Sequence, residues 1–301
     1  MNTTGIVYSI TGNSSRGQVA HYHGKPSPLK LNKTAHKVDV AGLKPVEQRT
    51  AVVFDGSEFE SKFTIGFEVE KNQLSRGAVR EYELFCGFER DGSCGYEAVT
   101  HILPLLPAGK WRTKVFDMMH KAERIIDDRF SPSDRRCGGH ITIGAQGLTG
   151  DELRAAVRVN AGIILSLFRK RIQNSYCSHN QRLQEEGLGW SEYAGGNHHK
   201  YCLALVKGNC LEFRVPSKFE SVKQMMRRYE LFYEVVNYSL NNPNGSHETL
   251  LKRLRPIVLS MYNGDVDKAN EVIDLSRHFR KFILTGEVHP SIAQYVSAPR
   301  N

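Results

Sequence analysis

The chain contains 301 residues, of which 40% are hydrophobic and 24% are charged. This composition is typical of a globular protein and excludes a disordered chain or a disulfide-rich miniprotein. The longest apolar stretch, residues 161–168, is far shorter than the ~20 residues of a membrane span, so we expect no membrane protein. Residues 1–24 lack the basic start, apolar centre and cleavage site of a secretion signal, which predicts a cytoplasmic protein. The six cysteines form no paired CxxC motif, so we expect reduced thiols.

Basic residues exceed acidic ones, 41 Lys and Arg against 32 Asp and Glu, and the net charge is +9. Such an excess favours polyanionic partners, among them nucleic acid, nucleotides and acidic polymers. Part of it lies in three short runs on expected helices: residues 169–171, residues 227–228, and Lys252 with Arg253 and Arg255. The simplest interpretation of these runs is that they are solvated helix faces rather than a binding groove.

The first 60 residues are rich in small and polar residues and show little periodicity, which predicts a partly irregular extension with one strand at residues 51–54. Short alternating segments between residues 63 and 215 predict a strand-bearing core. Two helices are expected to interrupt this core, at residues 113–130 and from residue 150 to about 172.

Apolar residues follow helical spacing from residue 219 onward. We expect helices that reach residue 236, then span 250–261 and 269–283, with turns at 241–246 and 262–265. The pattern therefore predicts three segments, namely an extension at 1–60, a core at 61–240 and a helical C-terminal segment at 241–301.

Polar side chains alternate with apolar ones in the expected strands. In the strand at residues 63–70 the odd positions are apolar, so Glu68 and Glu70 share the opposite face, about 7 Å apart. His140 in the sequence HITIG and Glu212 in the sequence LEFRV alternate with apolar neighbours in the same way. Glu97 begins another apolar run, after a turn-forming Asp-Gly pair.

Each strand taken alone fits an antiparallel sheet with one wet face. Acidic residues are nevertheless depleted on strands, and opposed like charges cost about 0.2 to 1 kcal/mol per pair unless cations lie between them. A group of glutamates with one histidine suits Mg²⁺ or Mn²⁺ better than Zn²⁺. The sequence therefore predicts a divalent metal site with the ligands Glu68, Glu70, Glu97, His140 and Glu212.

Four segments carry a resemblance to a known family: GFEVE at 66–70, DGSCGYEAVTHILPL at 91–105, CGGHITIG at 137–144 and KYCLALVKGNCLEFRVPS at 200–217. In this order and spacing they resemble the amidoligase family of the carboxylate-amine ligase superfamily, relatives of glutamate-cysteine ligase and glutamine synthetase. The resemblance covers residues 63 to 239 or so, and it implies that the core is an amidoligase-like catalytic domain. Members of the family occur in phage and bacterial genomes, and the resemblance implies that the chain is phage-related.

The resemblance implies an α+β fold in which a curled antiparallel sheet forms a glutamine-synthetase-like funnel with helices outside and ATP and metal ions inside. It also implies a reaction in which a carboxylate takes the γ-phosphoryl group of ATP and an amine then displaces phosphate to form an amide. Glu70, His140 and Arg214 would be catalytic, and Arg214 would neutralise charge on the phosphoryl group. The residues that would contact the nucleotide or substrate, besides Arg214, are Asp91, Ser93 and Arg182.

Arg182 lies in a glycine-rich segment, residues 180–197. This segment has two interpretations, a substrate lid and a surface loop without function.

A rival hypothesis is a non-catalytic protein on the same fold that binds nucleic acid or assembles with a protein partner through its positive charge. A third possibility joins the two, with a ligase that acts on a polymer-linked carboxylate or amine rather than on small molecules. Neither the identity of the substrates nor the oligomeric state can be predicted from the residues. The chain has no GxSxG, Walker A or Rossmann motif, and its His and Cys residues lack zinc-finger spacing.

Overall fold

A computed structural model describes residues 6–7, 60–92, 94–145, 147–174, 203–207 and 210–296. The chain divides into two compact units: unit 1 comprises residues 1–150, 207–212 and 218–226, and unit 2 comprises residues 151–206, 213–217 and 227–301. The expected boundaries at residues 60 and 240 remain predictions. Among the described residues, no helix combines the length and the apolar character that crossing a membrane requires.

The fold is α+β and contains a seven-stranded sheet with the order β4-β5-β3-β7-β9-β8, in which β6 also pairs with β3. Strand β3 pairs with β5, β6 and β7 in antiparallel orientation, and β4 pairs with β5 in the same way. Strands β4 and β8 lie at the two ends of this order, and within the described residues they do not pair with each other, so the sheet is not closed. The strands are β3 Phe63–Lys71, β4 Phe85–Asp91, β5 Gly95–Thr100, β6 Leu103–Pro104, β7 Ile141–Ala145, β8 Ala204–Lys207 and β9 Cys210–Phe213. A separate antiparallel pair joins β1 Ile6–Val7 to β2 Glu60–Ser61.

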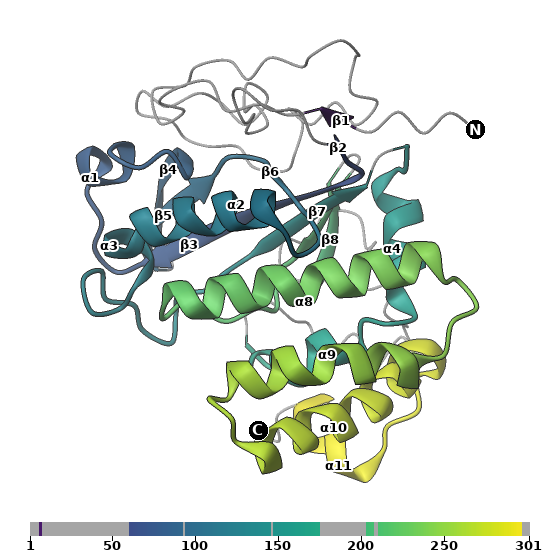
Figure 1. Ribbon diagram of the computed structural model, residues 1–301. Coiled ribbons are helices and arrows are strands. Elements are labelled where there is room, and N and C mark those ends of the chain that lie inside the picture. Colours follow the sequence, from purple (N-terminus) through teal and green to yellow (C-terminus); the bar gives the residue numbers. More distant parts are fainter. Residues whose placement is uncertain are drawn as a thin grey trace. The chain divides into compact units, whose positions relative to one another are not determined.

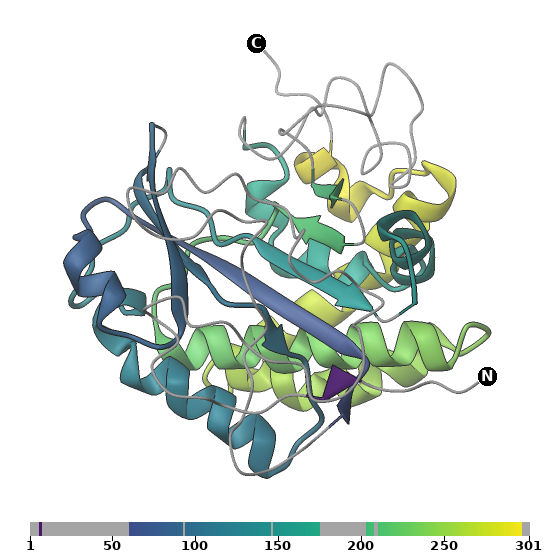
Figure 2. The ribbon, with the colours of Figure 1, turned by 90° about the horizontal axis from the view of Figure 1, so that it is seen from above.

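The long central strand β3, drawn in blue in Figure 2, runs through the sheet and projects its side chains alternately to the two faces. Its apolar residues Ile65, Phe67 and Val69 are buried, and the ring of Phe67 meets the edge of Phe219 at 5.6 Å between centroids. This strand confirms the alternation expected at residues 63–70 and extends it by one residue to Lys71.

The helix expected at residues 113–130 is wrong in its extent, because two helices replace it. Helix α2 Lys110–Lys121 and helix α3 Glu123–Ile126 are separated at Ala122, whose φ and ψ are −90° and 16°. The backbone is extended at Asp127, whose carboxylate accepts hydrogen bonds from the backbone N–H and the Nε of Arg129. These contacts stop the helix. The apolar stripe is confirmed, since all its members are buried: Val115, Met118, Met119, Ala122, Ile125 and Ile126.

The expected C-terminal helices are confirmed, with the expected turns between them. They are α8 Val222–Asn241, α9 His247–Met261 and α10 Val266–Thr285, followed by a short helix α11 Pro290–Val296 (Figure 1). Helix α10 begins at the N-cap Asp265, which accepts a hydrogen bond from Lys268 N, and ends at Gly286 in the left-handed conformation, with φ 75°.

The single helix expected from residue 150 to 172 is also wrong. Helix α4 Gly150–Arg158, helix α5 Gly162–Leu167 and a 3₁₀ helix at Arg169–Arg171 replace it. Gly162 packs so closely on α10 that a Cβ there would lie 2.4 Å from the carbonyl oxygen of Ser276. Arg280 of α10 donates from Nε to the carbonyl of Val159 at 2.9 Å. This tertiary contact satisfies a carbonyl that the broken helix leaves without a helical partner.

Arg228 contradicts the interpretation of the basic run at 227–228 as a solvated face. Its side chain is buried, its guanidinium donates to the hydroxyl and the carbonyl of Ser217, and it lies 4.9 Å from the ring centroid of Phe168. Lys252, Arg253 and Arg255 are exposed, as expected.

His247 begins α9 in a buried position. Its Nδ1 lies 3.2 Å from Oδ1 of Asn160, while the amide nitrogen of Asn160 donates to the Ser239 hydroxyl at 3.0 Å. Because an amide oxygen only accepts hydrogen bonds, Nδ1 must carry the proton in this contact. Burial, followed by the charge of Arg280, lowers the pKa of His247 from 6.5 to about 4.

The buried histidine predicts a specific loss of stability in acid. Between pH 6.5 and pH 4 the unfolded chain binds a proton at His247 and the folded chain does not, so the free energy of unfolding should fall by about 3 kcal/mol over this range. Urea unfolding of the wild type and of His247→Gln at pH 7 and pH 4 measures the difference. Equal pH dependence of the two proteins would contradict the assignment.

Candidate metal centre

Five of the predicted site residues lie on adjacent strands or directly before one, and all five are buried. The exposed fractions are 3% for Glu68, 4% for Glu70, 5% for Glu97, 8% for His140 and 0% for Glu212. Glu68 and Glu70 are on β3, Glu97 is on β5, Glu212 is on β9, and His140 immediately precedes β7. The simpler interpretation of a wet sheet face is therefore wrong for these residues.

Glu68, His140 and Glu212 form the centre of this cluster. Each offers one potential ligand atom, and these atoms all lie within 4.8 Å of one another. Nδ1 of His140 lies 2.5 Å from a carboxylate oxygen of Glu68, and the backbone N–H of Glu68 donates to the carbonyl of His140 at 3.1 Å. The three residues meet because β7 lies between β3 and β9 in the sheet.

Glu70 and Glu97 extend the cluster along the sheet. One carboxylate oxygen of Glu70 accepts a hydrogen bond from the backbone N–H of Gly138 at 2.5 Å, and the other lies 3.5 Å from Nε2 of His140. The imidazole is thus held between two carboxylates. Glu97 pairs with Glu70 in the β3–β5 register, which places the two side chains on the same face of the sheet.

Sequence reasoning missed one residue beside this cluster. Lys207, on β8, forms an ion pair with the buried carboxylate of Glu212. The signal for Lys207 was present, since it lies in the same segment as Glu212, KYCLALVKGNCLEFRVPS at 200–217.

The residues of this cluster fit a hard divalent cation. Carboxylate oxygens are the ligands that Mg²⁺ and Mn²⁺ prefer, and one imidazole is compatible with Mn²⁺ in particular. Ligands at about 2.1 Å from one Mg²⁺ ion lie at most ~4.2 Å apart, so small side-chain movements would bring Glu68, His140 and Glu212 onto a single ion. Burying several carboxylates together is costly unless positive charge compensates them, and a cation bound there would add to the charge of Lys207.

Other predicted site residues are not placed with this cluster. Arg214 follows β9 and belongs to unit 2, where its backbone N–H donates to the carbonyl of Leu203 at 2.9 Å. Its role at a phosphoryl group stays a prediction. Asp91 is the last residue of β4. Ser93 and Arg182 lie outside the described residues. The strand expected at residues 51–54 also lies outside them.

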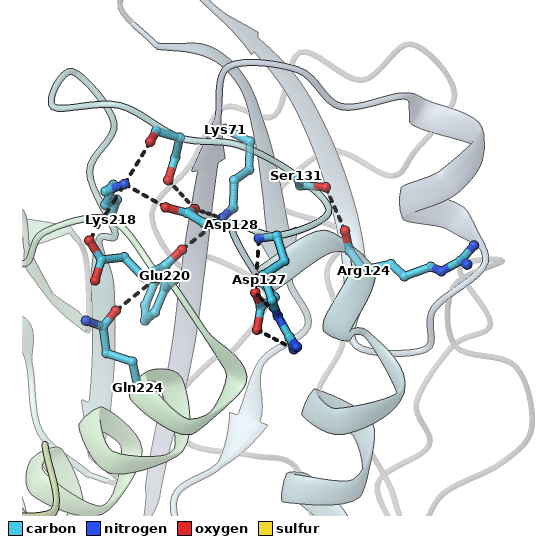
Figure 3. Close-up of polar contacts among 11 residues, drawn as sticks. Lys71, Arg124, Asp127, Asp128, Ser131, Lys218, Glu220 and Gln224 are labelled. Atoms are coloured by element: carbon cyan, nitrogen blue, oxygen red, sulfur yellow. Dashed lines mark hydrogen bonds and ion pairs between the residues drawn. The ribbon is translucent and has the colours of Figure 1, made fainter. Parts of the chain in front are cut away.

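The opposite face of β3 carries a second charged cluster, which the sequence reasoning did not find. Lys71 is fully buried, and its ammonium donates to Asp128 at 2.6 Å and to the carbonyl of Phe219 at 2.8 Å. Figure 3 shows Asp128 between Lys71 and Lys218, whose ammonium lies 2.6 Å from the other carboxylate oxygen. Ser133 also donates to Asp128.

Opposing effects set the protonation of this second cluster. Burial disfavours the charged form of Asp128, but hydrogen bonds from Lys218, Lys71 and Ser133 together outweigh it and hold the pKa of the carboxyl below its usual value. Burial also lowers the pKa of Lys71, against the attraction of Asp128. The cluster joins β3 to the segment after α3 and to the residues before α8, so we assign it a structural role.

Comparison with known proteins adds no relative to this description. No protein-family model matches the chain, and no curated protein matches it. The site is therefore interpreted from its own geometry.

Proposed function

We propose that the chain is an ATP-dependent carboxylate-amine ligase of the amidoligase type. The observation that carries the proposal is the buried group formed by Glu68, His140 and Glu212, whose potential ligand atoms lie within 4.8 Å of one another. The resemblance of four sequence segments to that family supplies the reaction. The open antiparallel sheet with its buried acidic residues is compatible with a glutamine-synthetase-like funnel, which is part of the same proposal.

Glu68, His140 and Glu212 would hold Mg²⁺ or Mn²⁺, with Glu70 and Glu97 as neighbouring ligands. A bound divalent cation supplies charge neutralisation for the phosphoryl oxygens of ATP. The contacts of Glu68 and Glu70 with the two ring nitrogens hold the His140 imidazole in one orientation. The N–H of Gly138 in turn orients Glu70. Lys207 contributes a positive charge beside Glu212.

The proposed reaction has two steps. A substrate carboxylate oxygen attacks the γ-phosphorus of ATP and ADP leaves, which forms an acyl phosphate. An amine then attacks the acyl carbon, phosphate leaves, and the nitrogen loses a proton to give the amide. Arg214 is proposed to neutralise the transferring phosphoryl group, and Asp91, Ser93 and Arg182 are proposed to contact the nucleotide or the carboxylate. The acid and the amine are small molecules or groups on a polymer.

Calorimetric titration of ATP tests this proposal without knowledge of the other substrates. Wild-type protein should bind ATP in the presence of Mg²⁺ and much more weakly in EDTA. Glu212→Ala should lose the Mg²⁺-dependent part of the binding while it keeps a cooperative thermal unfolding transition. Absence of ATP binding in every condition, or equal binding by wild type and variant, would contradict the proposal.

A further inference from the structure

A pocket in unit 1 is lined by residues outside the candidate metal centre. It has a volume of about 990 Å³, and its polar and aromatic lining includes Gln73, Glu81, Tyr82, Tyr96, Arg124 and Phe130. Tyr96 pairs with Lys71 in the β3–β5 register, whereas its chain neighbour Glu97 pairs with Glu70. Because successive side chains of a strand point to opposite faces, Tyr96 lies on the face opposite the metal centre.

The aromatic side of this pocket is unusually open to solvent. Phe130 is 51% exposed, and among the described residues the other exposed large hydrophobic side chains are two valines, Val266 at 50% and Val288 at 40%. The guanidinium of Arg129 lies 5.3 Å from the centroid of the Phe130 ring. Asp127 and Glu123 hold that guanidinium in place. The Phe130 ring is thus supported by a fixed cation and still offers surface to a planar ligand.

The charged side of the pocket is Arg124. Its side chain is exposed, and Figure 3 shows it pointing away from Asp127 and Asp128. Among the described residues, no carboxylate forms an ion pair with this guanidinium. The Ser131 hydroxyl donates a hydrogen bond to the backbone carbonyl of Arg124, at 2.6 Å. A guanidinium can bind a phosphate through two parallel hydrogen bonds. Glu81 is the opposing charge in the lining.

From this combination we infer that the pocket binds a nucleotide unit, with the base stacked on Phe130 and the phosphate on Arg124. Stacking on an aromatic ring beside a guanidinium is the common chemistry of sequence-tolerant nucleotide recognition. The volume suits one nucleotide, and the net charge of +9 favours a polyanion. The nucleotide is either free or part of a single strand. The inference is independent of the proposed ligase, since it involves the other face of the sheet and no metal.

Fluorescence anisotropy with a labelled oligothymidylate of about ten residues tests the inference, beside titration of thymidine 5′-monophosphate, both in EDTA. Phe130→Ala should weaken binding about tenfold, because one base loses its stacking partner. Phe130→Trp should restore it. Arg124→Gln should weaken binding and lower the slope of log affinity against log salt by about one. Glu81→Gln should tighten binding, because it removes a charge that repels phosphate.

Matched controls lie in unit 2: Val266→Ala removes an equally exposed apolar side chain, and Arg253→Gln removes an exposed arginine. Binding of the oligonucleotide alone identifies a single strand as the ligand, and binding of the mononucleotide identifies a free nucleotide. The inference is overturned if neither probe binds, or if the control variants weaken binding as much as Phe130→Ala and Arg124→Gln do. Because EDTA removes divalent cations, failure here leaves the Mg²⁺-dependent ATP titration unaffected.

Discussion

Replacing Glu68 by Gln is expected to weaken Mn²⁺ binding by at least about 100-fold, since even partners outside the ligand shell contribute 10- to 100-fold to metal affinity. The amide keeps the shape of the side chain and can still accept a hydrogen bond from Nδ1 of His140. What it removes is the negative charge that a hard cation requires. Electron paramagnetic resonance of Mn²⁺, titrated into the protein without nucleotide, measures the change.

The stability of the metal-free protein separates this effect from misfolding. Removing one carboxylate from a group of buried glutamates relieves repulsion, so Glu68→Gln should unfold at a temperature no lower than the wild type in EDTA. Mn²⁺ should raise the unfolding temperature of the wild type and leave that of Glu68→Gln nearly unchanged. Glu287→Gln, which alters an exposed ion pair with Lys281, serves as control. Wild-type affinity in Glu68→Gln would rule out a cation at this cluster.

Replacing Asp128 by Ala is expected to destabilise unit 1 by about 3 to 5 kcal/mol, because it leaves the buried ammonium of Lys71 without its counter-charge. Lys218 loses the same partner. Asp128→Asn should cost less, since an amide oxygen still accepts hydrogen bonds. Urea unfolding at pH 7 measures these differences.

A double variant identifies the mechanism of this loss. If the cost comes from an unpaired buried charge, Lys71→Met combined with Asp128→Ala should be more stable than Asp128→Ala alone. Additive losses would contradict that explanation. The contribution of Asp128 is present at neutral pH and should disappear as the pH falls through its lowered pKa, because protonation then removes the charge that binds both lysines.

Most elements of secondary structure were predictable from local patterns. The period of two at residues 63–70 and the helical spacing after residue 219 match the observed strand β3 and helix α8. They match because one face of each element is buried, and apolar residues recur along the chain at the period of that face. The end of the helix at Asp127 and the helix interruption before Gly162 were not predictable. They depend on the polar contacts of Asp127 and on the approach of α10 to Gly162, which local spacing does not encode.

The composition of the candidate site was predictable for a similar reason. Alternation places Glu68 and Glu70 on one face whatever the rest of the chain does. The exposed alternative, a wet sheet face, has the same sequence pattern, so only the burial of Glu97 and Glu212 in the fold distinguishes the two. Lys71 was missed because a lysine at an apolar position has meaning only when its partner Asp128 is known.

The sequence by itself determined which side chains share a face, because backbone geometry within a strand sets their directions. It also determined the charge of the chain and the order of its helices. Only the tertiary structure decided that His140 lies beside Glu68, 72 positions away in the chain, and that Glu212 joins them. The physical reason is that the order of strands in a sheet depends on which strand edges pair and which faces are buried across the whole chain. The local sequence of one strand does not specify its partners.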